Sequence, residues 1–169
     1  MVAVRIAAVG DERDVARVHV HSWRVGYEGL IPREILDQIR QEDRAARYEF
    51  ERRDESSPLT IVASADREIV GFATLGSSRD PEYPNEGEIF ALYVDPDHWG
   101  HGVGRALMRN ARRTLRQRTC VRAHLWVLEG NLRATRFYEA DGWTCDGRLR
   151  TDEVWGVELH QIHYRRELT

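Results

Sequence analysis

Several stretches of the chain alternate apolar and polar residues, which is the pattern of a half-buried β-strand. In the clearest, 121–128, the odd-numbered positions hold Val, Ala, Leu and Val, and the even-numbered positions hold Arg, His, Trp and Leu. Weaker or shorter patterns predict strands at 2–8, 59–65, 69–75, 88–94, 143–149 and 157–166. The strands at 59–65 and 69–75 are expected to form a hairpin around Asp66 and Arg67.

Apolar residues spaced three or four positions apart predict the helices between these strands. After Asp11, a residue type that often caps helices, Ala16, Val20, Trp23 and Tyr27 recur at this spacing. Further helices are predicted at 33–39 behind Pro32, at the highly charged segment 41–53, at 103–118, and from Asn131 to just before Gly142.

The order of the predicted elements is one strand, two or three helices, three strands, and then helix, strand, helix and two strands. This order indicates an α+β protein with one mixed sheet. The helix between strands 88–94 and 121–128 forms a crossover, so these strands should be parallel and their connection right-handed. A length of 169 residues is enough for one domain with a proper core, and we expect a single domain over 1–169.

Composition and charge exclude several classes of function. The net charge of -3 argues against a nucleic-acid partner, and no apolar run approaches the roughly 20 residues of a membrane helix. With two cysteines and no signal-peptide pattern at the start, a reducing cytoplasm is the expected location. Two histidine pairs, His19–His21 and His160–His163, could bind a metal, but no Cys or carboxylate stands at the spacing needed to complete either set of ligands. We therefore expect no metal.

Three glycines, Gly100, Gly102 and Gly104, lie between a predicted strand and a predicted helix. Glycine costs conformational entropy, and a phosphate approaching the bare backbone at a helix start would offset that cost. A Walker loop is excluded because Arg105 and Ala106 follow Gly104 where Lys and Ser or Thr are needed. The dinucleotide pattern also fits poorly, which leaves another phosphate ligand or a tight turn without a ligand.

A second motif lies at 131–142, where Asn131, Ala134, Phe137, Tyr138 and Gly142 follow the pattern N-x-x-A-x-x-F-Y-x-x-x-G. Together with the glycine turn, it resembles the GCN5-related N-acetyltransferase (GNAT) superfamily, and the resemblance extends in element order over 4–164. It implies a twisted mixed sheet of six to seven strands flanked by about four helices. The parallel fourth and fifth strands of that sheet are splayed apart.

The resemblance also implies acetyl-CoA as co-substrate, with its pyrophosphate on the glycine turn and its pantetheine arm between the splayed strands. Trp99 departs from the family pattern, which usually has Gln or Arg there, and this puts one polar contact in doubt. The implied coenzyme-binding residues are Leu92, Tyr93, Val94, Trp99, Gly100, His101, Gly102, Val103, Gly104, Arg105, Asn131, Ala134 and Phe137.

Two residues carry the expected chemistry. By resemblance Tyr138 is the general acid, because a phenol can protonate the thiolate that leaves when an acetyl thioester reacts with an amine. Glu88 begins the coenzyme-facing strand and is the candidate general base, with Glu86 close behind on the loop. Strand alternation predicts that Glu88, Phe90 and Leu92 share one face of their strand.

The acceptor pocket is expected to be aromatic and acidic, as suits a cationic amine. Its candidate residues are Trp23, Tyr27, Glu28 and Trp126, with Tyr83 and Trp155 as further aromatic candidates. The expected function is acetyl-CoA-dependent N-acetylation of a primary amine on a small molecule or peptide. A different acceptor or acyl donor, or an acyl-CoA-binding regulatory module without transfer, are the alternatives. A homodimer is the oligomeric state that the resemblance suggests.

Overall fold

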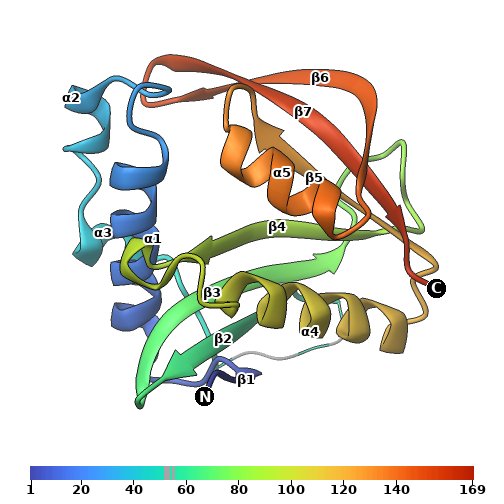
Figure 1. The fold of residues 1–169 in the computed structure, drawn as a ribbon, viewed down its shortest axis with the longest axis horizontal. Helices are drawn as coiled ribbons and strands as arrows, with labels where there is room; N and C mark the ends of the chain where they lie inside the picture. The colour runs from blue at the N-terminus through green and yellow to red at the C-terminus, as the bar shows by residue number, and fades with distance from the viewer. Residues whose placement is uncertain (52–53, 55) are drawn as a thin grey trace.

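The described residues of the computed structural model, 1–51, 54 and 56–169, form one seven-stranded sheet in the order β1-β2-β3-β4-β5-β7-β6 (Figure 1). Strands β4 and β5 are parallel, and every other neighbouring pair is antiparallel. This architecture confirms the predicted fold class. The strands are β1 Ala3–Ile6, β2 Leu59–Ala65, β3 Glu68–Ser77, β4 Gly87–Val94, β5 Arg122–Leu128, β6 Thr144–Val154 and β7 Val157–Glu167. The helices are α1 Glu12–Gly26, α2 Arg33–Leu36, α3 Gln41–Ala45, the 3-10 helix η1 Pro96–His98, α4 Val103–Gln117 and α5 Leu132–Ala140.

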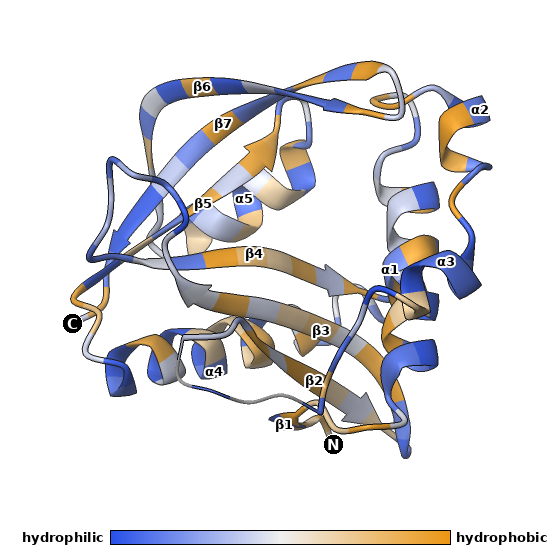
Figure 2. Ribbon diagram, turned by 180° about the vertical axis from the view of Figure 1, so that it is seen from behind, coloured by the Kyte–Doolittle hydropathy of each residue, from blue (hydrophilic) through white to orange (hydrophobic). Residues whose placement is uncertain are grey.

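Helices cover the sheet on both faces, and each covered face has its own apolar cluster. Leu107 and Leu115 of α4 are fully buried against one face, together with Leu75 of β3. On the other face, Val18 of α1 packs against Phe72 of β3. Hydrophobic residues accordingly concentrate along β2 and β3, while the outer strand β6 is mostly exposed (Figure 2). Each fully buried leucine contributes about 2 kcal/mol by removal of apolar surface from water, so α4 is a principal support of the sheet.

Strands β4 and β5 pair over a short length and then diverge. Their register contains two pairs, Gly87 with Ala123 and Glu88 with His124. A Cβ atom at Gly87 would lie 2.8 Å from the Leu115 side chain, so α4 packs tightly against this closed end. Strand β7 pairs along the length of β5 on its other edge, which leaves the gap between β4 and β5 open towards the glycine turn.

A β-bulge at Phe90 changes which face of the sheet the later side chains of β4 point to. Two successive residues of β3, at 74 and 75, oppose Ala91 and Ile89, so β4 holds one extra residue between them. As a result Ile89 and Leu92 both pack in the cluster beneath α4, while Ala91 packs in the cluster beneath α1. The prediction that Glu88 and Leu92 share a face is therefore wrong, because strict alternation does not continue through a bulge.

Three local predictions differ from the structure. The segment 41–53 is helical only over Gln41–Ala45, which buries no residue, and Arg52 and Arg53 lie outside the described residues. Asp11 precedes α1 but does not cap it, because its carboxylate accepts hydrogen bonds from Arg5 and from the Ala8 backbone N–H. Strand β6 continues to Val154, five residues beyond the predicted end at 149, because it pairs along β7. None of the described helices is long and apolar enough to cross a membrane.

Candidate active site

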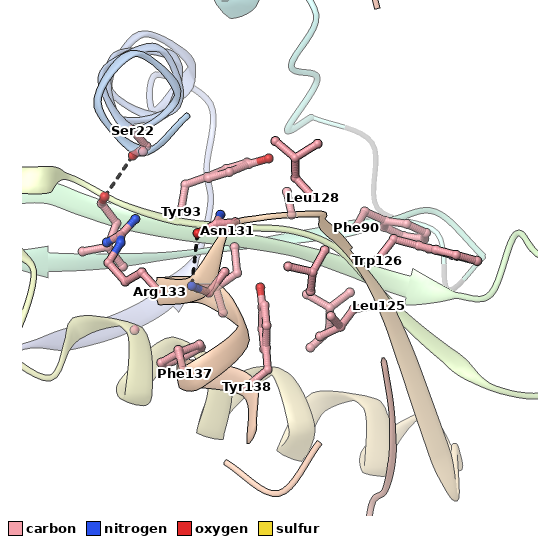
Figure 3. Close-up of a pocket in the computed structure, with 18 of the residues that line it drawn as sticks. Ser22, Phe90, Tyr93, Leu125, Trp126, Leu128, Asn131, Arg133, Phe137 and Tyr138 are labelled. Atoms are coloured by element: carbon pink, nitrogen blue, oxygen red, sulfur yellow. Dashed lines mark hydrogen bonds between the residues drawn. The ribbon is translucent and has the colours of Figure 1, made fainter. Parts of the chain in front are cut away.

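A cavity of about 710 Å³ occupies the gap between β4 and β5. Ser22, Arg133 and Phe137 lie at one end of the close-up in Figure 3, Phe90 and Trp126 lie at the other, and Tyr138 stands between them. Of the predicted site residues, the cavity is lined by Tyr27, Glu88, Leu92, Tyr93, Val94, Trp99, Gly100, Gly102, Gly104, Arg105, Trp126, Asn131, Ala134, Phe137 and Tyr138.

Four predicted site residues are not part of the lining of this cavity. The Trp23 ring packs against Tyr27 at a centroid distance of 5.0 Å, and Glu28 lines a separate cavity near α2. His101 is exposed, with its Nδ1 atom 2.9 Å from the Trp99 carbonyl oxygen. The Val103 side chain is buried in the core, so only its backbone N–H remains available to a ligand.

The backbone conformation of the glycine turn, residues 100–104, is suited to binding an anion. Gly100 and Gly102 have φ angles of +80° and +81°, and a Cβ atom at either position would meet nothing within 4 Å. Gly102 precedes the first turn of α4 without a side-chain cap, so the first N–H groups and the positive end of the helix dipole face the cavity side. This open space against bare backbone fits the phosphates of a coenzyme.

Gly104 serves a different purpose from the two glycines before it. A Cβ atom there would lie 3.2 Å from the Phe137 ring, so the absence of a side chain allows α5 to approach α4 closely. Phe137 thereby reaches the cavity lining. Asn131 is the N-cap of α5, and its Oδ1 atom accepts a hydrogen bond from the Ala134 N–H at 3.2 Å. Among the described residues its amide nitrogen has no partner, so it can bind a ligand.

Trp99 turns back toward the end of β4. Its indole Nε1 donates a hydrogen bond to the Val94 carbonyl oxygen at 2.8 Å, and the Arg133 guanidinium lies 3.1 Å from the centre of the ring. The Ser22 hydroxyl donates to the same oxygen at 2.9 Å. The indole therefore fixes the end of β4 and does not fill the space beside Gly102.

The edge of β4 that faces the gap has free backbone groups. The Asp95 N–H donates to Val70 of β3, and backbone groups alternate in direction along a strand, so those of Val94 and Leu92 point away from β3. The Val94 carbonyl is occupied by Trp99 and Ser22, but the Val94 N–H and both groups of Leu92 are available to an extended ligand.

Tyr138 projects from α5 into the cavity between its two ends (Figure 3). Its hydroxyl has no hydrogen-bond partner within the part of the chain that the structure describes. Burial raises the pKa of the Tyr138 phenol, and the nearby Tyr93 adds to this effect. The phenol is therefore protonated at neutral pH and can act as a proton donor.

Glu88 lies at the closed end of the gap, and its side chain is buried. Its Oε2 atom accepts a hydrogen bond from the Arg79 N–H at 2.9 Å and lies 4.0 Å from His124 Nε2. His124 is fully buried, and burial together with the charge of His163 lowers its pKa to about 4. Glu88 therefore has a neutral imidazole beside it at pH 7, whereas Glu86 is engaged by Arg165 in an ion pair.

Sequence reasoning missed several residues at the closed end of the cavity. Arg79, Arg150 and Gln161 line it, and they come from a loop and two outer strands. No local motif marks them, because each is an isolated polar residue in an ordinary strand or turn. Of the further aromatic candidates, Tyr83 stacks on His163 at 4.9 Å, outside the lining.

One group of potential metal ligands, His21, Asp95 and Asp97, comes together at η1. The Asp95 carboxylate is already paired with Arg17 at 2.9 Å and accepts the Asp97 N–H at 3.1 Å. These contacts give Asp95 a structural role as the cap of η1.

Comparisons with known proteins agree with this geometry. The family model described as the acetyltransferase (GNAT) family matches residues 19–143. The uncharacterised N-acetyltransferase YuaI of Bacillus subtilis is 34% identical over 167 residues, which is 96% of this chain and 91% of that protein. An N-acetyltransferase structure from Staphylococcus aureus superposes with a TM-score of 0.77 at 17% identity, covering 100% and 99% of the two chains. The PaiA N-acetyltransferase of Thermoplasma acidophilum, solved in complex with coenzyme A, gives 0.70 at 19% identity and covers 99% of both chains.

The fold, the family match and the relatives thus define an acetyltransferase. The chain belongs to the GNAT acetyltransferase family.

Proposed function

We propose that this protein transfers the acetyl group of acetyl-CoA directly to a primary amine of a small molecule or peptide. The observation that carries the proposal is the placement of an unpartnered, protonated phenol, Tyr138, inside the cavity that begins at the glycine turn. The two features line the same cavity, one at the start of α4 and one within α5.

The residues around the cavity fit the coenzyme. The N–H groups of Gly102 and Val103 would hold the pyrophosphate, and the free edge of β4 at Leu92 would pair with the amides of the pantetheine arm. Arg105 and Asn131 would add polar contacts from the cavity wall. When bound, acetyl-CoA supplies the acetyl thioester.

Two side chains would move the protons of the reaction. The Tyr138 hydroxyl donates its proton to the thiolate sulfur as the C–S bond of the thioester breaks, and its raised pKa keeps it protonated at neutral pH until then. The Glu88 carboxylate accepts a proton from the amine, directly or through one water molecule. Its neutral neighbour His124 offers no competing positive charge at pH 7.

Replacement of Tyr138 by phenylalanine tests this assignment. We expect Tyr138→Phe to lower kcat by about 100-fold or more near neutral pH while acetyl-CoA still binds, because general acid catalysis contributes roughly this much. Tyr164→Phe is the matched control, since Tyr164 is a buried tyrosine whose hydroxyl donates to Glu139, away from the cavity. Thiol release followed by a colorimetric reagent gives the rate.

Three outcomes would count against the proposal. An unchanged rate of thiol release in Tyr138→Phe would remove the general-acid role. Binding of acetyl-CoA without turnover on any amine would instead favour an acyl-CoA-binding regulatory module, and turnover on a hydroxyl acceptor or with a longer acyl donor would change the reaction class.

A further inference from the structure

The closed end of the cavity has a chemistry distinct from that of the coenzyme end. Arg79, Phe90, Trp126 and Arg150 line it near the point where β4 and β5 are still paired. Phe90 lies four residues, about 13 Å, before Val94, the last residue of β4, and the glycine turn lies beyond that end of the strand. These residues are therefore placed to contact the acceptor and not the pyrophosphate.

Arg150 presents an unpaired guanidinium edge to this end. Its Nε atom donates a hydrogen bond to Gln161 Oε1 at 2.6 Å and lies 3.3 Å from Asp152 Oδ2. Its guanidinium carbon lies 4.5 Å from the centre of the Trp126 ring, which fixes the plane of the group. Both contacts use Nε, so among the described residues Nη1 and Nη2 keep their N–H donors for a ligand.

Arg79 is held in a similar way. Its guanidinium carbon lies 3.8 Å from the centre of the Phe90 ring, at the β4 bulge. Its side chain makes no hydrogen bond or ion pair within the described part of the chain. Burial lowers the pKa of Arg150, the charges of Asp152, Glu88 and Asp80 oppose this, and the charge of Arg79 adds to it. Arg79 therefore lies within electrostatic range of Arg150, as do these three acids.

Two cations held on aromatic rings with unused donors form a carboxylate site, because a guanidinium edge binds a carboxylate through two parallel hydrogen bonds. Glu88 lines the same end, which places an acid near the amine that the transfer requires. The expectation of an aromatic and acidic pocket does not include the two arginines.

We propose that the acceptor is an amino-acid-like molecule, whose amine lies beside Glu88 and whose carboxylate is bound by Arg150 and Arg79. This inference rests on the proposed acetyl transfer and adds the class of its acceptor. The amide nitrogen of Gln161, whose oxygen is taken by Arg150, supplies a further donor for the carboxylate. A polyamine such as spermidine offers no anionic group to these donors.

Matched acceptors test the proposal. The twenty protein amino acids are assayed with acetyl-CoA, and the best acceptor is compared with its α-amide, its decarboxylated amine and spermidine. We expect the carboxylate form to exceed each of the others at least 10-fold in kcat/KM. A short peptide with the same N-terminal residue separates a free amino acid from a peptide N-terminus.

Variants at the two arginines locate the carboxylate. We expect Arg150→Gln and Arg79→Gln each to raise KM for the carboxylate acceptor by 10-fold or more, with less than threefold change for the amide and partial recovery in Arg150→Lys. Arg113→Gln, on the exposed face of α4, is the matched control and should change neither value.

Calorimetric titration separates this inference from the proposed function. The amino acids and amines are titrated into the protein saturated with coenzyme A, so binding is measured without turnover. Loss of amino-acid binding in Arg150→Gln with acetyl-CoA binding intact supports the carboxylate site. Equal or better use of decarboxylated amines or spermidine, or absence of amino-acid binding and turnover in a protein that binds acetyl-CoA, overturns it. A protein that does not bind acetyl-CoA refutes the proposed function instead.

Discussion

Substitution of Gly102 tests the coenzyme cradle, by which we mean the glycine turn at residues 100–104. The added methyl group of alanine has two separate effects, one on the stability of the free protein and one on coenzyme binding. A Cβ atom at this position meets no protein atom within 4 Å, but it enters the space that we assign to the pyrophosphate. The φ angle of +81° makes alanine strained there, at a cost to the free energy of unfolding of about 1–2 kcal/mol. Loss of one charge-assisted hydrogen bond to phosphate costs about a further 1.5–3 kcal/mol, in binding alone.

These magnitudes give a definite thermal-shift result. At a coenzyme concentration of 100 times its Kd, binding stabilises the wild-type protein by about 2.7 kcal/mol. A loss of 1.5–3 kcal/mol weakens the Kd by about 10- to 150-fold, so the same concentration would stabilise Gly102→Ala by only about 0.3–1.4 kcal/mol. The assay is thermal denaturation with and without coenzyme A, with the shift in Tm converted to free energy.

Gly147→Ala is the matched control for this experiment. Gly147 also has a φ angle of +81° and open space at its Cβ position, but it lies in β6 outside the lining of the cavity. We expect the two variants to lose similar stability without ligand, and only Gly102→Ala to lose the ligand-induced shift. Equal coenzyme shifts in both variants would refute the cradle.

Two further predictions concern titrating groups. Glu88→Gln should lower the rate by about 100-fold, and most at low pH, where the amine acceptor is protonated and needs the base; a pH–rate profile that keeps its shape would exclude Glu88 as the base. Burial, aided by the charge of Arg44, lowers the pKa of His19 from 6.5 to about 3. Protonation of this imidazole therefore favours the unfolded chain, and the folded protein loses stability as pH falls below 6.5. Between pH 7 and pH 5 the loss in free energy of unfolding amounts to about 2 kcal/mol. Urea denaturation at the two pH values should therefore show a smaller loss of stability in His19→Gln than in wild type. Identical losses in the two proteins would contradict a neutral buried His19.

The cavity lining near the glycine turn could be predicted from the sequence because its residues lie in two continuous motifs. Residues 99–105 and 131–142 each belong to one strand-to-helix or loop-to-helix junction, so local glycine and cap patterns are enough to single them out. Their side chains converge on one cavity because α5 packs against α4 at Gly104.

The acceptor half could not be predicted in the same way. Arg79, Trp126, Arg150 and Gln161 meet only through the pairing of β5, β6 and β7, and each is an ordinary polar or aromatic residue in its own segment. The bulge at Phe90 depends on the register of β4 with β3, which apolar alternation within β4 does not encode. Tertiary pairing therefore decides which residues line this end of the cavity.

The central claim is that the gap between β4 and β5, entered over the glycine turn, is an acetyl-CoA site. Calorimetric titration of the wild-type protein with acetyl-CoA, beside ATP and NAD, tests it most directly. The account predicts saturable binding of acetyl-CoA in the micromolar range and none of comparable strength for ATP or NAD. Absence of acetyl-CoA binding, or equally strong binding of ATP, would contradict it.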